Sequence, residues 1–118
     1  MGVTTLDIDV ANPSRPAVTA RLTFTVDSGA FYSVVPAPVL RKLRIRPQKR
    51  ETFRLADGST IVRWKGGALF KFQEYVGFAD VIFGEKGDAT LLGALSLEAL
   101  GLALDPIKRE LKPMTLLM

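Results

Sequence analysis

The sequence contains neither cysteine nor histidine among its 118 residues. Without cysteine there is no disulfide, no thiolate nucleophile and no zinc-thiolate site. Without histidine, Ser-His-Asp and Cys-His catalysis and the HExxH zinc motif are excluded within one chain, and the commonest metal ligand is absent. Any acid-base chemistry must therefore use Asp, Glu, Lys or Tyr.

Long apolar runs are also missing. No stretch of about 18 uncharged apolar residues occurs, which predicts no membrane-spanning helix. The opening residues, Met1 to Asp7, lack the basic-then-apolar order of a secretion signal, so we expect a cytoplasmic protein that does not bind membranes. The length, with 47% hydrophobic residues, predicts a single domain over residues 1–118 with one core.

The net charge of +4 raises the question of a nucleic-acid partner. One basic segment stands out, Arg41 to Arg50, where Leu40, Leu43 and Ile45 are interleaved with the charges. Charge runs of this kind more often form a solvated face than a nucleic-acid site, so we expect no nucleic-acid binding. The same segment could instead attract acidic substrates.

Short segments with period-two alternation or β-branched and aromatic residues dominate the chain. Two short helices are expected, one from about Pro38 to Leu43 and one capped by Ser96 that runs through Leu100 and stops at Gly101. Gly66-Gly67 indicates a bend between strands. The pattern predicts a mostly-β barrel or sandwich. The expected strands are Thr4 to Val10, Ala17 to Val26, Phe31 to Val35, Glu51 to Leu55, Thr60 to Trp64, Ala68 to Phe72, Val76 to Phe83, Leu102 to Leu104 and Leu111 to Met118.

The triplet Asp27-Ser28-Gly29 follows a long apolar strand and precedes another. Such a triplet arises by chance in on the order of a few per cent of chains this long. Taken alone, it favours an Asx-type turn in which Asp27 only caps the backbone. Its position between two buried strands would instead project a carboxylate from a tight loop in the sheet.

Two further features bring the chain into resemblance with the retropepsin-like, or retroviral-type, aspartic peptidases. Phe24 to Ala30, followed by Ser33-Val34-Val35-Pro36, resembles the catalytic loop of that family. Leu91-Leu92-Gly93 resembles its second signature of two apolar residues and glycine, directly before the helix of the family. The resemblance covers about Val18 to Pro113 and is nearest in style to the small prokaryotic members.

The hairpin signal Asp57-Gly58 lies where this family places its flap. The bend between Trp64 and Gly67 competes for that assignment. The chain departs from the viral members in lacking a glycine-rich flap tip, and it has Ser28 where threonine is commoner. Serine keeps the hydroxyl group, so this difference is compatible with activity.

The resemblance implies a single closed, β-barrel-like acid-protease domain with one or two short helices, active as a two-fold homodimer. Asp27 of each subunit would activate a water that hydrolyses a peptide bond, with Ser28 and Gly29 shaping the loop. No metal or cofactor is implied. Substrate contacts are expected from Ala30 and from the flap residues Ala56, Asp57, Gly58, Ser59 and Thr60.

Two alternatives remain at this point. The first is a non-catalytic module of the same fold that binds a peptide or protein. The second is a small basic β-barrel that binds nucleic acid through Arg41 to Arg50. The intact Asp27-Ser28-Gly29 favours the peptidase, because a binding module would not need that carboxylate.

Overall fold

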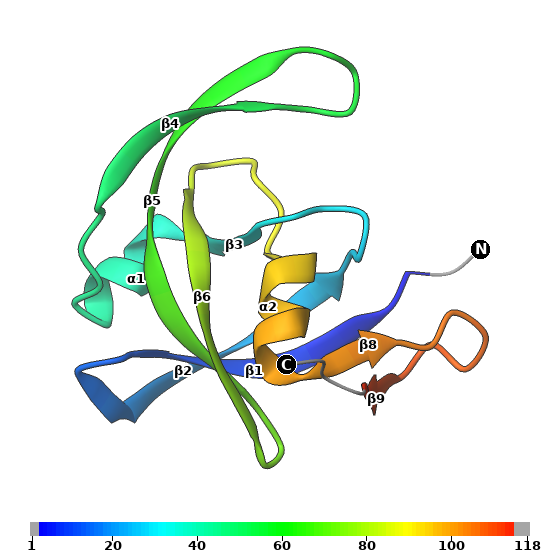
Figure 1. Cartoon of the computed structure of the whole chain (residues 1–118). Helices are drawn as coiled ribbons and strands as arrows, with labels where there is room; N and C mark the ends of the chain where they lie inside the picture. Colours follow the sequence, from blue (N-terminus) through cyan, green and yellow to red (C-terminus); the bar gives the residue numbers. More distant parts are fainter. Residues whose placement is uncertain (1–2, 115–118) are drawn as a thin grey trace.

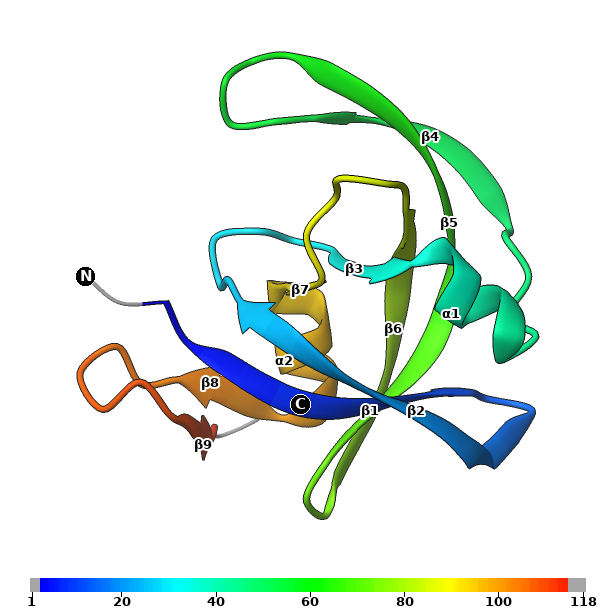
Figure 2. The same cartoon turned by 180° about the vertical axis from the view of Figure 1, so that it is seen from behind.

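A computed structural model describes residues 3–114, which fold into one compact, mostly-β unit with 54% strand and 12% helix. Figures 1 and 2 show it from opposite sides. No helix in this part of the chain has the length and apolar character needed to cross a membrane. In chain order the elements are β1 (Thr5–Asn12), β2 (Arg15–Val26), β3 (Ser33–Pro36), α1 (Ala37–Lys42), β4 (Lys49–Arg54), β5 (Thr60–Phe72), β6 (Tyr75–Gly84), β7 (Leu91–Leu92), α2 (Ala94–Leu100), β8 (Leu102–Leu104) and β9 (Leu111–Pro113).

Seven strands form one sheet in the order β1-β2-β7-β3-β6-β5-β4. An additional antiparallel pairing of β1 with β5, in which Val10 lies opposite Phe70, closes this order into a ring. Side chains alternate along the strands, so that Ile8, Val10 and Phe24 point inward and are fully buried. The Phe24 and Phe70 rings meet edge to face with centroids 6.2 Å apart, which places the centre of the core between β2 and β5.

Helix α2 packs against β6. The contact is close because β6 has a glycine there: a Cβ on Gly77 would lie 2.4 Å from the backbone carbonyl carbon of Ala99. The helix ends where Gly101 adopts a left-handed conformation with φ of 74°, as the sequence predicts. A small second sheet of β8 and β9 follows.

Two local predictions were wrong, and a third is covered only in part by the described residues. Thr60 to Trp64 and Ala68 to Phe72 are one continuous strand, because the Gly66-Gly67 pair stays extended and makes room for neighbouring side chains instead of turning the chain. The residue at the start of α2 is Gly93; Ser96 lies inside the helix and is buried. The last strand is Leu111–Pro113, and the rest of the predicted segment, 115–118, lies outside the described residues.

Candidate active site

Asp27 lies immediately after β2, at the point where the strand leaves the sheet. Its Oδ1 accepts a hydrogen bond from the backbone N–H of Gly29 at 2.9 Å, and its carbonyl accepts one from the N–H of Ala30 at 3.2 Å. The first bond is that of an Asx turn and the second closes a β-turn, so the local geometry expected for a simple turn is present. Asp27 is nevertheless exposed.

Strand β7 supports this turn by pairing with the strands on either side of it. It inserts between the two strands that flank the turn, pairing in parallel with β2 and antiparallel with β3, so that Leu91 lies opposite both Thr25 and Val34. The N–H of Asp27 donates to the carbonyl of Leu92 at 3.0 Å. The two segments that carry the family resemblance, Asp27-Ser28-Gly29 and Leu91-Leu92-Gly93, are therefore hydrogen-bonded neighbours, although they are far apart in sequence.

At Gly93 the backbone packs closely against Phe31 and Tyr32, at the end of the same loop. A Cβ at this position would lie 2.6 Å from the carbonyl oxygen of Tyr32 and 2.8 Å from that of Phe31. Such contacts with backbone atoms leave no room for a side chain, which is why glycine follows the two leucines. The next residue, Ala94, donates its N–H to the carbonyl of Ala30 at 2.7 Å.

A buried polar cluster completes this support. The hydroxyl groups of Ser33 and Ser96 are 2.5 Å apart, both residues are fully buried, and Ser33 Oγ also accepts the N–H of Gly93 at 2.9 Å. Buried hydroxyls are costly unless they are hydrogen-bonded, and these two satisfy each other. The cluster ties β3 to α2 directly beneath the Asp27 loop.

The predicted flap residues, Ala56 to Thr60, form the tip of the β4–β5 hairpin. Leu55 N–H donates to Ser59 O at 2.8 Å, and Asp57 Oδ1 accepts from the N–H of Ser59 at 2.9 Å and from its hydroxyl at 2.5 Å. These hydrogen bonds hold the pKa of Asp57 below its ordinary value of 3.8. The turn therefore lies where the Asp57-Gly58 signal places it. Both views show the hairpin arching above the segment that joins β2 to β3 (Figures 1 and 2).

Within the described part of the chain, no hydrogen bond or ion pair joins this tip to Asp27. A contact between the hairpin and the loop is instead made beside the tip, at Phe53 near the end of β4, whose ring meets that of Tyr32 edge to face with centroids 5.4 Å apart. Lys65 Nζ lies 5.1 Å from the centre of the Tyr32 ring and forms ion pairs with Glu51 at 3.3 Å and Asp80 at 3.1 Å. The hydrogen bond to Asp80 raises the pKa of Lys65 above 10.5, so this contact carries a full positive charge at neutral pH.

The surface near Asp27 combines a hollow with exposed apolar side chains. A hollow of about 370 Å³ opens beside the carboxylate, between the start of β1 and the β8–β9 turn. Three large side chains on the bordering segments are strongly exposed: Val3, which lines the hollow, at 70%, Phe31 in the loop after Asp27 at 72%, and Ile107 in the β8–β9 turn at 90%. The loop, the start of β1 and the β8–β9 turn lie on the same side of the molecule (Figure 1). The hollow is lined by Val3, Thr4, Thr25, Val26, Asp27, Leu104, Pro106 and Arg109.

Three features of this site were missed from the sequence. The contact of Tyr32 with the hairpin could not be predicted, because the sequence shows only that Tyr32 follows the loop. Ser33 and Ser96 could have been found, because each is a serine set among aromatic or aliphatic residues. The contribution of residues near Val3 and Ile107 depends on how the start of β1 and the β8–β9 turn come together, which no local pattern predicts.

Ser28 lies beside Asp27 at the turn, and its side chain is exposed. Across residues 3–114 its hydroxyl has no hydrogen-bond partner.

Comparison with protein-family models gives no match for this chain, and comparison with curated proteins gives none either. The resemblance of the site therefore rests on its own residues and geometry.

Proposed function

We propose that the chain is one subunit of a homodimeric aspartic endopeptidase, a closed β-barrel-like domain whose Asp27 meets its own copy across a two-fold axis. The observation that carries the proposal is the pairing of β7 between β2 and β3. It places Leu91-Leu92-Gly93 directly under Asp27-Ser28-Gly29 and fixes one exposed carboxylate in a tight loop. A turn that only linked two strands would not need a third strand and a close glycine contact to support it.

The chemistry requires two carboxylates that share one proton. One of them draws a proton from water while the other, protonated, donates a hydrogen bond to the carbonyl oxygen of the scissile peptide. One chain supplies a single such group at this loop, so the second comes from an identical subunit. Because the pair must hold one proton, we expect activity at acid to neutral pH.

The exposed apolar side chains around Asp27 support dimerisation through this face. Val3, Phe31 and Ile107 would lose water on association, and burial of apolar surface is the main driving force for it. The Ser28 hydroxyl is free to pair with the partner subunit. The β4–β5 hairpin, held to the loop through Tyr32, would cover an extended peptide that lies across both Asp27 residues.

The first experiment compares Asp27→Asn with Asp57→Asn on a mixed peptide library. Asparagine keeps the shape of both turns, because its side-chain oxygen also accepts the backbone N–H. We expect Asp27→Asn to lower kcat/KM by on the order of a thousandfold or more, and Asp57→Asn by no more than a few-fold. Equal activity of Asp27→Asn and the parent would contradict the proposal.

A subunit-mixing experiment tests the shared site. A ninefold excess of Asp27→Asn protein, equilibrated with the parent, should lower the activity per parent subunit to about a tenth, because most parent subunits would then lie in mixed dimers. A monomeric enzyme would keep its full activity. A dimer that cleaves no peptide and binds no statine-type inhibitor would instead indicate a peptide-binding module of the same fold.

A further inference from the structure

The basic segment after α1 has an unusual backbone. The helix ends with Ile45 N–H donating to Leu40 O at 3.0 Å and Arg44 N–H donating to Arg41 O at 2.9 Å. In this type of helix end the residue at the position of Arg44 is left-handed and is usually glycine. Here it is an arginine with φ of 62°. A charged side chain therefore occupies a position whose left-handed backbone favours glycine, which has no side chain.

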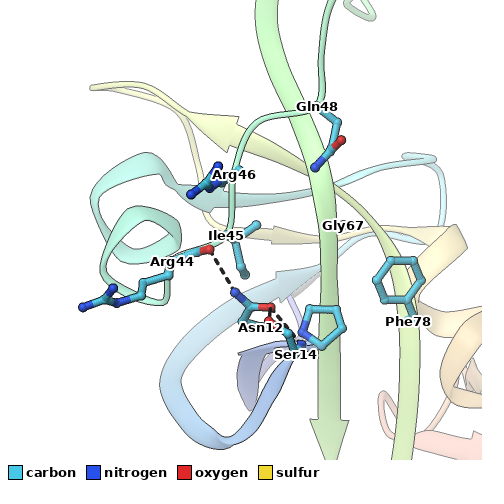
Figure 3. Close-up of a pocket in the computed structure, with 9 residues that line it drawn as sticks. Asn12, Ser14, Arg44, Ile45, Arg46, Gln48, Gly67 and Phe78 are labelled. Atoms are coloured by element: carbon cyan, nitrogen blue, oxygen red, sulfur yellow. Dashed lines mark hydrogen bonds between the residues drawn. The ribbon is translucent and has the colours of Figure 1, made fainter.

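The β1–β2 turn holds the segment in this conformation. Asn12 Nδ2 donates to the carbonyl of Leu43 at 3.2 Å and to that of Arg44 at 2.9 Å. Asn12 Oδ1 accepts from both the N–H and the hydroxyl of Ser14, at 2.9 and 2.8 Å, which fixes the amide (Figure 3). The backbone of the basic segment is thus preorganised by another part of the fold.

Two hollows have three lining residues in common, Arg44, Ile45 and Arg46. The first has a volume of about 420 Å³. The second, of about 400 Å³, is also lined by Arg41 and Pro47. The guanidinium group of Arg44 points away from Phe78, so the charged and apolar parts are separated (Figure 3). The first hollow is lined by Asn12, Pro13, Ser14, Arg44, Ile45, Arg46, Gln48, Gly67 and Phe78, and the second by Arg41, Arg44, Ile45, Arg46 and Pro47.

The arginines that line the two hollows are not neutralised by the protein. From Ala37 to Arg50 there are six Lys and Arg residues and no acidic residue, and of these Lys49 pairs with Glu51 at 2.9 Å. Among residues 3–114, no carboxylate forms an ion pair with Arg41, Arg44 or Arg46. Elsewhere on the molecule Arg21, Arg63 and Lys65 all have carboxylate partners.

The first hollow also has an exposed apolar side chain in its lining, Phe78. Phe78 is 58% exposed, and its ring lies over Gly67, where a Cβ would come within 2.5 Å of the ring. The absence of a side chain at Gly67 therefore leaves space for this ring, which lines the first hollow. An aromatic side chain left in solvent next to a preformed hollow is typical of a recognition surface.

We infer that these two hollows bind an extended acidic polypeptide segment, with a carboxylate at Arg44 and Arg46 and a neighbouring apolar side chain against Phe78. Arginine suits carboxylates because its guanidinium group donates two parallel hydrogen bonds. Single-stranded nucleic acid fits less well, because it needs a row of stacking aromatic rings, and Phe78 is the single aromatic residue lining either hollow in the described part of the chain.

This surface is separate from the Asp27 loop. The segment after α1 and the loop between β2 and β3 lie on opposite sides of the molecule in Figure 1, and the hollow beside Asp27 has no lining residue in common with the two described here. Binding at this surface therefore does not depend on the proposed peptidase activity.

Fluorescence anisotropy with a labelled peptide of alternating glutamate and leucine tests the inference. All proteins carry Asp27→Asn, so that no probe is cleaved. We expect saturable binding that weakens as salt is added, and a roughly tenfold higher Kd for Arg46→Glu. Lys86→Glu, which makes the same charge change on an exposed loop elsewhere, should alter Kd by no more than about twofold.

A second variant separates binding from folding. Arg44→Gly should weaken peptide binding by roughly fivefold while raising the midpoint of thermal unfolding, because glycine accepts the left-handed backbone without strain. Lack of saturable binding by the parent, or equal affinity of Arg46→Glu and Lys86→Glu, would overturn the inference. Tighter binding of oligouridylate than of the acidic peptide, lost in Arg46→Glu, would assign the surface to nucleic acid instead.

Discussion

Asp27 and Asp57 form almost the same turn in very different surroundings. In each, the carboxylate accepts the backbone N–H of the residue two positions further on, at 2.9 Å. Asp27 is supported from below by β7 and by the close approach of Gly93. Asp57 lies at the end of a hairpin whose tip contacts little else. Local turn chemistry is therefore the same, and the difference in expected role comes from what is packed beneath each turn.

The Asp27 loop and the β4–β5 hairpin are also held in place by different kinds of interaction. Apart from the bond from Gly29 N–H to the Asp27 carboxylate, the Asp27 loop is held by backbone hydrogen bonds and by the buried Ser33–Ser96 pair, neither of which involves an ionisable group. The hairpin is held to the body by a ring contact at Tyr32 and by ion pairs at Arg63 and Lys65. The first support should tolerate changes of pH and salt, whereas the second should respond to both.

The largest effect is expected at Gly93. Gly93→Ala would place a Cβ within 2.6 Å of Tyr32 O, so the backbone of the loop must shift. We expect a loss of about 2–3 kcal/mol in the free energy of unfolding, measured by urea denaturation, together with loss of peptidase activity. Gly87→Ala is a control without a clash: no atom lies within 4 Å of its new Cβ, and it adds only the strain of a left-handed backbone with φ of 92°, whereas Gly93 has φ of −96° and no such strain. If Gly93→Ala cost no more than Gly87→Ala, the Asp27 loop would not be held by this contact.

A smaller effect is expected where β5 is tied to the loop after β6. Arg63 makes two hydrogen bonds to Asp88, at 2.7 and 3.0 Å, and they hold the pKa of Asp88 below 3.8. A carboxyl whose pKa is lowered by folding adds stability above its unfolded pKa and loses it as pH falls through the folded value. Asp88→Asn should therefore cost about 1–2 kcal/mol at pH 7, since the pair is largely shielded from water.

The pH dependence is the sharper part of that prediction. Urea unfolding of the parent and of Asp88→Asn should converge as the pH is lowered from about 5 to about 2, because the parent then loses the contribution of the ionised Asp88. A constant difference between the two proteins over this range would show that the ion pair does not anchor the hairpin. Gly93→Ala should show no such convergence, since its cost is steric.

Much of the mostly-β fold could be predicted from alternation along the strands, and the Asp57-Gly58 turn from its residues. The continuity of β5 could not, because Gly66-Gly67 reads as a bend until Phe78 and Ile45 are seen to occupy the space beside it. Ser96 was mistaken for a cap for a similar reason: its partner, Ser33, is 63 residues away. Pairings between distant segments decided these cases, and a single sequence does not display them.

The smallest effect is expected at the tip of the hairpin. Gly58 has φ of 87° with nothing within 4 Å of its Cβ position, so Gly58→Ala adds backbone strain and no clash. We expect a cost of about 1 kcal/mol or less, confined to the hairpin and detected as faster amide exchange of the tip with an unchanged rate in β2. If exchange in β2 also rose, the tip would be coupled to the Asp27 loop through Tyr32 more strongly than its contacts imply. The Asp57 turn would then belong to the support of the site, and the contrast between the two turns would have to be redrawn.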